Sequence, residues 1–142
     1  MESSLFSLSG KTALVTGGGR GIGLALAKGL AEHGADVALV ARTKEQLEAA
    51  ARRIQTETGR NAWTFPFDVE NVEEIEGLFE SIITETQGID ILVNCAGMTI
   101  RGPAEDVDLA TWNRVIQVNL TSVLMLSQVF CRHRKQAGKP GR

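Results

Sequence analysis

The stretch from Thr12 to Gly23, TALVTGGGRGIG, constrains this chain more than any other part of its sequence. A short apolar run over 13–15 has the length and bulk of a buried strand, and an amphipathic helix is expected over 22–32. The glycines between them allow a tight backbone turn and leave N–H groups open to a ligand. Because a helix start carries partial positive charge and unpaired donors, the stretch predicts a pyrophosphate cradle. A glycine-rich turn that binds nothing is the alternative.

The rest of the chain alternates further strands and helices. Strands are expected over 36–41, 61–67 and 90–94, and helices after a capping box at 43–46 and over 72–86. Pro66 predicts an edge position or a strand end for its segment. Short connections between such elements predict an α/β fold, a Rossmann-type doubly wound parallel sheet of which the first four strands are present.

One long helical stretch is expected from Asp108 to Gln136, with Asp108 as its N-cap. Its broad apolar face predicts burial against the sheet, against a partner subunit, or against both. The members of this face are Trp112, Val115, Ile116, Leu120, Val123, Leu126 and Phe130. The basic segment 132–142, which overlaps the end of this stretch and contains Lys135 and Lys139, is expected to be irregular.

The last expected strand lacks a neighbour on one side. In the common doubly wound order, residues 91–93 would form an unpaired apolar edge, which favours aggregation. We therefore expect residues 1–142 to be one NAD(P)-binding domain truncated at its C-terminal end, the first part of a longer protein.

Composition narrows the choice of partners and compartments. The formal net charge of −2 gives no basic field for nucleic acid or an anionic membrane, and no run approaches a membrane span. Met1 to Gly10 lacks the features of a signal segment. Cys95 and Cys131 offer neither a disulfide framework nor metal-ligand spacing, so we expect a cytoplasmic protein without a metal.

Four motifs occur in an order that resembles the short-chain dehydrogenase/reductase family. They are Thr16-Gly17-x-x-x-Gly21-x-Gly23, Asp68-Val69, Asn94-Cys95-Ala96-Gly97 and Asn119. The resemblance covers about residues 8–130. In one motif Cys95 replaces the second asparagine of the family's N-N-A-G, which removes an amide. A small buried cysteine is a commoner reading of Cys95 than a reactive thiol.

The resemblance implies a set of cofactor-binding residues and one catalytic residue. The cofactor-binding set is Thr16, Gly17, Gly19, Arg20, Gly21, Ile22, Gly23, Arg42, Thr43, Asp68, Val69, Asn94, Ala96 and Gly97. Asp68 is expected near the adenine amino group, and an aspartate that caps a helix or turn is the alternative. Asn119 is expected to hold a water in a proton relay, and an amide bonded to backbone is the alternative.

Arg42 decides the expected cofactor. A carboxylate at the end of the second strand would bond a ribose 2′-hydroxyl, whereas arginine accommodates a 2′-phosphate. Here Ala41-Arg42-Thr43 contains no carboxylate, and Arg20 offers a second guanidinium for the same phosphate. We therefore expect NADP(H) to be preferred over NAD(H), with two solvated surface arginines as the alternative.

By resemblance, the reaction is hydride transfer between nicotinamide and a small-molecule carbonyl or alcohol, with tyrosine, lysine and serine as catalytic groups. The chain contains no tyrosine, so residues 1–142 lack the catalytic half. The substrate classes considered are sugar acids or polyols, 3-oxoacyl carrier-protein thioesters and tropinone-like ketones. Arg101 could meet an anionic substrate, although an exposed loop arginine is the simpler reading.

Family resemblance also implies a homo-oligomer, a dimer or tetramer, formed through the long helix. A different hypothesis is a truncated, catalytically inert protein that binds nucleotide or pairs with other subunits. A methyltransferase-type nucleotide fold is the weakest alternative, because such folds usually carry an acidic residue where Arg42 stands.

Overall fold

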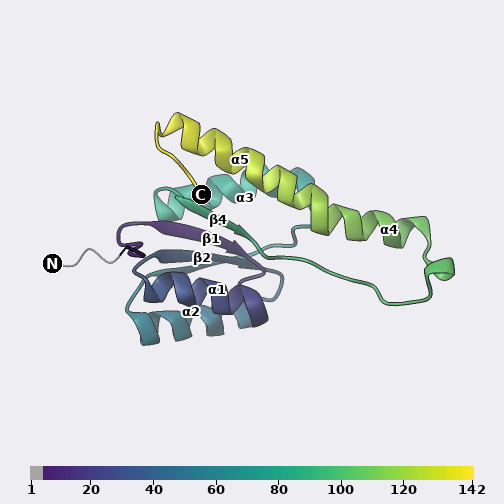
Figure 1. Ribbon diagram of the computed structural model, residues 1–142, viewed down its shortest axis with the longest axis horizontal. Coiled ribbons are helices and arrows are strands. Elements are labelled where there is room, and N and C mark those ends of the chain that lie inside the picture. The colour runs from purple at the N-terminus through teal and green to yellow at the C-terminus, as the bar shows by residue number, and fades with distance from the viewer. Residues whose placement is uncertain (1–4) are drawn as a thin grey trace.

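A parallel four-stranded sheet lies between two layers of helices in the computed structural model, which describes residues 5–142 (Figure 1). The strand order is β3-β2-β1-β4, which confirms the predicted Rossmann-type architecture. The strands are β1 (Thr12–Thr16), β2 (Asp36–Ala41), β3 (Ala62–Pro66) and β4 (Ile91–Asn94). The expectation for residues 1–10 falls partly on residues 1–4, which lie outside the described part.

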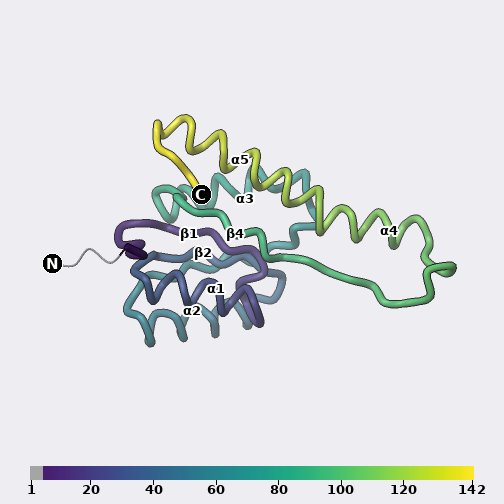
Figure 2. Tube along the Cα trace, viewed as in Figure 1, coloured from purple at the N-terminus to yellow at the C-terminus, as the bar shows by residue number. Residues whose placement is uncertain are grey.

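Helices alternate with the strands along the chain, whose course the tube in Figure 2 traces. They are α1 (Gly21–Glu32), α2 (Lys44–Thr58), α3 (Ile75–Thr86), α4 (Leu109–Ile116) and α5 (Ser122–Gln136). Short 3-10 turns occur at Val72–Glu74 and Ala104–Asp106. Helices α1 and α2 cover one face of the sheet, and α3 and α5 cover the other.

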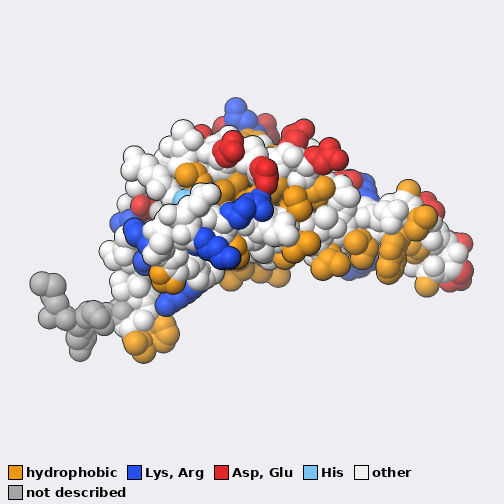
Figure 3. Space-filling model, turned by 90° about the horizontal axis from the view of Figure 1, so that it is seen from above, with side chains coloured by type: hydrophobic (Ala, Val, Ile, Leu, Met, Phe, Trp, Pro, Cys, Tyr) orange, Lys and Arg blue, Asp and Glu red, His pale blue; other side chains and the backbone are white. Residues whose placement is uncertain are grey.

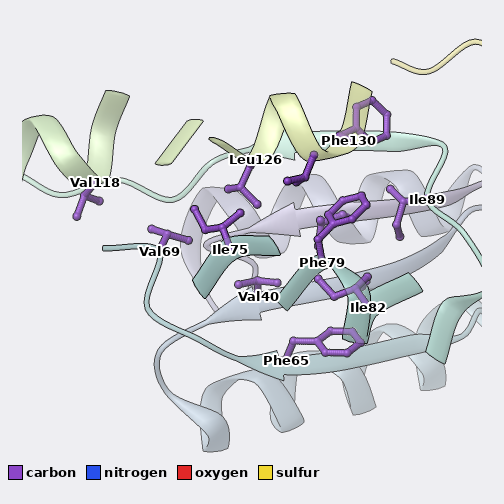
Figure 4. Packing of buried hydrophobic residues seen from close by; sticks show 13 residues of the cluster. Val40, Phe65, Val69, Ile75, Phe79, Ile82, Ile89, Val118, Leu126 and Phe130 are labelled. Atoms are coloured by element: carbon purple, nitrogen blue, oxygen red, sulfur yellow. The ribbon is translucent and has the colours of Figure 1, made fainter. Parts of the chain in front are cut away.

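Two apolar cores result because successive strand side chains point to opposite faces. In β1, Ala13 and Val15 pack toward α1 and α2, whereas Leu14 packs toward α3 and α5. Figure 4 shows the second core, in which Val69 and Val118 lie at the same end of the cluster. Burial on both faces explains why the strands read as continuous apolar runs.

Several predicted boundaries are confirmed. Pro66 ends β3, which is an edge strand. Gly59 ends α2 in the left-handed conformation, with φ 69°. The Asp108 carboxylate caps α4 by accepting from the Thr111 N–H at 2.6 Å, and this bond lowers the pKa of Asp108.

The predicted capping box at the start of α2 is wrong. Thr43 does occupy the N-cap position, but its side chain makes no capping hydrogen bond. The acidic Glu45 in the first turn interacts favourably with the helix dipole. This interaction helps α2 to begin at Lys44 without a capping hydrogen bond from the Thr43 side chain.

The long helical stretch differs from the expected regular helix. A π-helical turn, Gln117–Thr121, separates α4 from α5, and Asn119 lies within it. Such turns are rare in proteins overall, and those that occur often lie at functional sites. Lys135 lies in the last turn of α5 rather than in an irregular segment.

The stretch Leu109–Gln136 also corrects the expectation that no segment approaches a membrane span. By length and composition alone it is long and apolar enough to cross a membrane, since an 18-residue window within it has a mean hydropathy of 1.3. Polar residues such as Gln117 and Gln128 interrupt its apolar runs, so a search for uninterrupted runs misses it. Core helices meet the same criterion, and α5 packs on the sheet through Leu126, Val129 and Phe130.

The β4 edge is not wholly unpaired, which corrects another expectation. The Leu92 N–H donates to the Arg142 carbonyl at 2.8 Å, and the Arg142 N–H donates to the Asp90 carbonyl at 3.2 Å. Buried Arg134 holds this tail, because its guanidinium donates to the Pro140 carbonyl and pairs with the Asp90 carboxylate at 2.9 Å.

His133 should make the stability of the α3–α5 layer sensitive to pH. Burial, and then the charge of Arg134, lower the pKa of His133, and its ring packs edge-on against Phe79. Its Nε2 accepts from the Ile89 N–H at 3.4 Å, and protonation would remove that acceptor. Since the folded state binds this proton less readily than the unfolded state, stability is full above the unfolded pKa of about 6.5 and falls as pH drops through the folded value.

The measurement is the free energy of unfolding in urea between about pH 7.5 and pH 5, across the unfolded histidine pKa. We expect His133→Gln to lose less stability than the wild type over this interval. Parallel curves for the wild type and His133→Gln would contradict the prediction.

Candidate functional site

A cavity of about 370 Å³ opens at the carboxyl ends of the strands. Ligands of open α/β sheets bind at this edge, where the strand order changes direction. Twelve predicted cofactor-binding residues line it: Gly17, Gly19, Arg20, Gly21, Ile22, Gly23, Arg42, Thr43, Asp68, Val69, Ala96 and Gly97.

The glycine loop is tightly folded against its surroundings. Gly17 has φ 69°, and a Cβ there would lie 3.1 Å from the Ala96 backbone. A Cβ on Gly23 would lie 2.0 Å from the Gly17 carbonyl oxygen, a distance that no side chain tolerates. The Gly18 N–H donates to the Val40 carbonyl at 3.2 Å, which ties the loop to the end of β2. Glycine is therefore required at positions 17 and 23.

The start of α1 faces the cavity without a capping side chain. The N-cap residue is Arg20, in extended conformation, and the first turn contains no acidic residue. Gly21 follows at φ 55°, with open space where a Cβ would be. The first N–H groups of a helix have no partner within it, so they and the helix dipole suit an anionic ligand.

Arg20 and Arg42 both line the cavity and are both exposed. Within residues 5–142, neither guanidinium has an ion-pair partner. Gln46 and Thr43 line the same part of the wall, next to Gly19. The cavity wall thus includes two guanidinium groups without an ion-pair partner among the described residues, one in the glycine loop and one directly after β2.

Asp68 takes part in a turn and lines the cavity as well. Its carboxylate accepts from the Glu70 N–H at 3.0 Å, and its carbonyl accepts from the Asn71 N–H at 3.0 Å. The turn alternative is therefore present in the structure, and contact with adenine stays a prediction.

Thr16 lies behind the cavity wall rather than in it. The residue is 1% exposed, and its Oγ1 accepts from the Cys95 and Ala96 N–H groups, both at 3.1 Å. It thus supports the loop that closes the cavity after β4. Asn94 is also absent from the lining, and its amide lies 3.4 Å from the Ser127 hydroxyl.

Asn119 holds the backbone of the loop after β4. Its Oδ1 accepts from the Met98 N–H and its Nδ2 donates to the Met98 carbonyl, both at 2.8 Å. The structure therefore shows the alternative, in which the Asn119 amide is bonded to the backbone, although the residue is exposed rather than buried. The water-holding role stays a prediction.

Sequence reasoning missed part of the cavity wall. The missed residues are Ala41, Gln46, Phe67, Glu70, Cys95, Met98 and Val118. Phe67 and Val118 have the pattern of core positions, so nothing in the sequence separates them from the core. Arg101 is exposed and lies outside the lining.

The cavity suits binding more than acid–base catalysis. The ionisable side chains that line it are Arg20, Arg42, Asp68, Glu70 and Cys95. In the part of the chain that the structure describes, no cluster of three or more His, Cys, Asp or Glu side chains has metal-site geometry. The expectation of no metal stays a prediction.

Comparisons with known proteins agree with this arrangement. A family profile described as short chain dehydrogenase matches residues 11–142. The 5-keto-D-gluconate 5-reductase of Escherichia coli (strain K12) is 40% identical over 139 residues, which are 96% of this chain and 54% of that protein.

Two solved structures are also similar. L-sorbose reductase from Gluconobacter frateurii, complexed with NADPH and L-sorbose, gives a TM-score of 0.88 at 31% identity, over 94% of this chain and 51% of that one. An NAD⁺-bound xylitol dehydrogenase gives a TM-score of 0.87 at 32% identity, over 96% of this chain and 52% of that one. The chain spans about half the length of the relatives it matches.

Proposed function

Because this chain belongs to the short-chain dehydrogenase family, we propose that it is the cofactor-binding part of an NADP(H)-dependent oxidoreductase. The reaction moves a hydride between the nicotinamide ring and the carbon of a small-molecule carbonyl or alcohol, while a proton is exchanged at the oxygen. The bound cofactor supplies or accepts the hydride, and the described residues bind and orient it.

The observation that carries this proposal is the convergence of three features on one cavity. The glycine loop lets the backbone approach a ligand, the uncapped start of α1 offers N–H donors, and two arginines line the cavity, one in that loop and one after β2. Pyrophosphate fits the first two features. A phosphorylated ribose fits the third, because a guanidinium binds phosphate through two hydrogen bonds.

The preference for NADP(H) depends on Arg42 and Arg20 rather than on the relatives. One similar structure holds NADPH and another holds NAD⁺, so similarity to these proteins does not decide which cofactor this chain prefers. The end of β2 offers no carboxylate for a ribose 2′-hydroxyl, and the guanidinium groups of Arg42 and Arg20 in the cavity wall favour a 2′-phosphate.

Arg42→Ala should weaken NADPH binding by about tenfold to a hundredfold, since hydrogen bonds to charged groups contribute about 1.5–3 kcal/mol each. NADH affinity should change by less than about twofold, because NADH lacks the 2′-phosphate. The measurement is fluorescence titration of both cofactors. Arg52→Ala on α2 is the control, since it removes the same charge from an exposed position outside the cavity. Unchanged NADPH affinity, or an equal loss for both cofactors, would contradict the clamp.

For the substrate we propose a polyhydroxy carbonyl or alcohol, a sugar acid or polyol. The similar proteins named above act on 5-keto-D-gluconate, L-sorbose and xylitol, as their names state, which supports this class. Asn119 would hold the water of the proton relay, and the acid–base tyrosine would come from outside residues 1–142, which contain none.

The absence of tyrosine also favours a second candidate, an inert protein that binds nucleotide or pairs with other subunits. An NADPH titration of residues 1–142, combined with a turnover assay on polyols and keto-sugars that uses the protein purified from its native source, distinguishes the two. Binding with turnover supports the oxidoreductase, and binding without turnover supports the second candidate. In either case we propose a cytoplasmic protein.

The proposed homo-oligomer would form through the outer face of α4 and α5. Leu109, Trp112, Leu120 and Leu124 are 72%, 58%, 62% and 55% exposed. Figure 3 shows hydrophobic side chains gathered on the arm of the molecule that α4 forms. We expect light scattering to give a multiple of the monomer mass, and Trp112→Glu to lower it. A monomeric wild type would contradict this proposal.

A further inference from the structure

We propose that Arg114 and Gln117 are positioning residues for the cofactor, which hold the loop after β3 in the shape that faces the nucleotide. This inference rests on the proposed cofactor site. Neither residue lines the cavity, and both act through Glu70, which does.

Two independent contacts fasten Glu70 to the long helix. The Arg114 Nε donates to both carboxylate oxygens of Glu70, at 2.9 and 3.0 Å. The Gln117 Nε2 donates to the Glu70 backbone carbonyl at 2.8 Å. One contact holds the side chain and the other holds the backbone, so together they fix the position and the orientation of this residue.

Glu70 in turn fixes the cofactor-facing turn. Its N–H donates to the Asp68 carboxylate, and the intervening Val69 is buried and lines the cavity. The Arg114 guanidinium interacts with both carboxylates of this turn. Its pKa is raised mainly by the hydrogen bond and charge of Glu70, and to a smaller degree by the charge of Asp68. A displacement of Glu70 would therefore move Asp68 and Val69.

The same short segment holds the opposite side of the cavity. Asn119 binds the backbone of Met98. Val118, which lies between Gln117 and Asn119 in the sequence, lines the cavity. Residues 114–119 thus hold the loops that follow β3 and β4 at once and set the distance between two cavity walls. By linkage, a nucleotide bound between these loops should stabilise their contacts with the helix by as much as those contacts strengthen its binding.

The test uses Arg114→Gln, Gln117→Ala and the double variant, with two readouts. The first is NADPH affinity by calorimetry, and the second is hydrogen exchange of the amides over 67–72 without nucleotide. Arg132→Gln is the matched control, because Arg132 pairs with Glu76 on the surface between α5 and α3, outside the cavity.

We expect each single variant to lose about two- to fivefold in affinity, as for exposed pairs, and the double variant about tenfold. Exchange over 67–72 should accelerate in all three, and the control should match the wild type in both readouts. The affinity loss of Arg114→Gln should shrink in about 1 M salt, since salt screens exposed charges.

Gln117→Ala separates positioning from simple charge, because it leaves the net charge unchanged. If only Arg114→Gln weakens binding while exchange over 67–72 stays at the wild-type rate, Arg114 acts as a distant cation and the inference is overturned. A wild type that does not bind NADPH overturns the proposed function instead, and unchanged exchange in the variants overturns the positioning role on its own.

Discussion

Gly23→Ala should reduce NADPH affinity by about a hundredfold or more, a loss of roughly 2.7 kcal/mol. The added Cβ would lie 2.0 Å from the Gly17 carbonyl oxygen, 2.6 Å from its carbon and 3.2 Å from Gly18 Cα. All three atoms are backbone, so no side-chain rotation relieves the clash. The glycine loop and the start of α1 must separate, which moves the N–H donors away from the phosphates. Overpacking of this kind costs about 1–3 kcal/mol of stability as well.

Gly29→Ala is the matched control on the same helix. A Cβ at position 29 meets nothing within 4 Å, and the residue lies inside α1. Alanine is about 0.5–1 kcal/mol better than glycine within a helix, so this variant should be slightly more stable and bind NADPH normally. Urea denaturation and fluorescence titration measure both properties. Wild-type affinity in Gly23→Ala would show that the loop does not hold the pyrophosphate.

Local signals predicted the parts of the fold that are local in origin. The apolar run before Thr16, the glycines after it and the cap at Asp108 each depend on neighbours in sequence, and the structure agrees with them. The strand order is the common doubly wound order that the alternating elements predicted, and Pro66 indicated an edge position or a strand end for its segment.

Features that depend on tertiary contacts were not predictable. The bond between Arg114 and Glu70 joins residues 44 positions apart. The π-helical turn and the missing cap at Thr43 are backbone details that residue types alone do not specify. In the site, the family motifs identified residues that cluster at the cavity but not the direction of their side chains. Thr16 and Asn119 therefore proved to hold neighbouring loops, while Glu70 and Val118 were missed.

Thr16→Val should destabilise the protein by about 1–3 kcal/mol and weaken NADPH binding at least about tenfold, because two part-buried N–H donors lose their acceptor, at about 0.5–1.5 kcal/mol for each hydrogen bond. Valine has nearly the shape of threonine, so the buried site stays filled. The substitution removes the Oγ1 that accepts from the Cys95 and Ala96 N–H groups and donates to the Val93 carbonyl at 3.5 Å. Both of these residues line the cavity, so the wall after β4 loses its support at the point where Gly17 approaches it.

Thr16→Ser keeps the hydroxyl and removes the methyl group, at a cost of about 0.8 kcal/mol for one buried carbon. Serine should therefore lose some stability yet bind NADPH like the wild type, whereas valine should lose both. Unfolding in urea gives the first quantity and cofactor titration the second. Valine and serine variants of equal affinity would mean that Thr16 serves packing alone. If only the valine variant, which lacks the hydroxyl, loses NADPH affinity, then Thr16 shapes the cavity wall from outside the cavity. We infer the same kind of role for Arg114 and Gln117 on the opposite side.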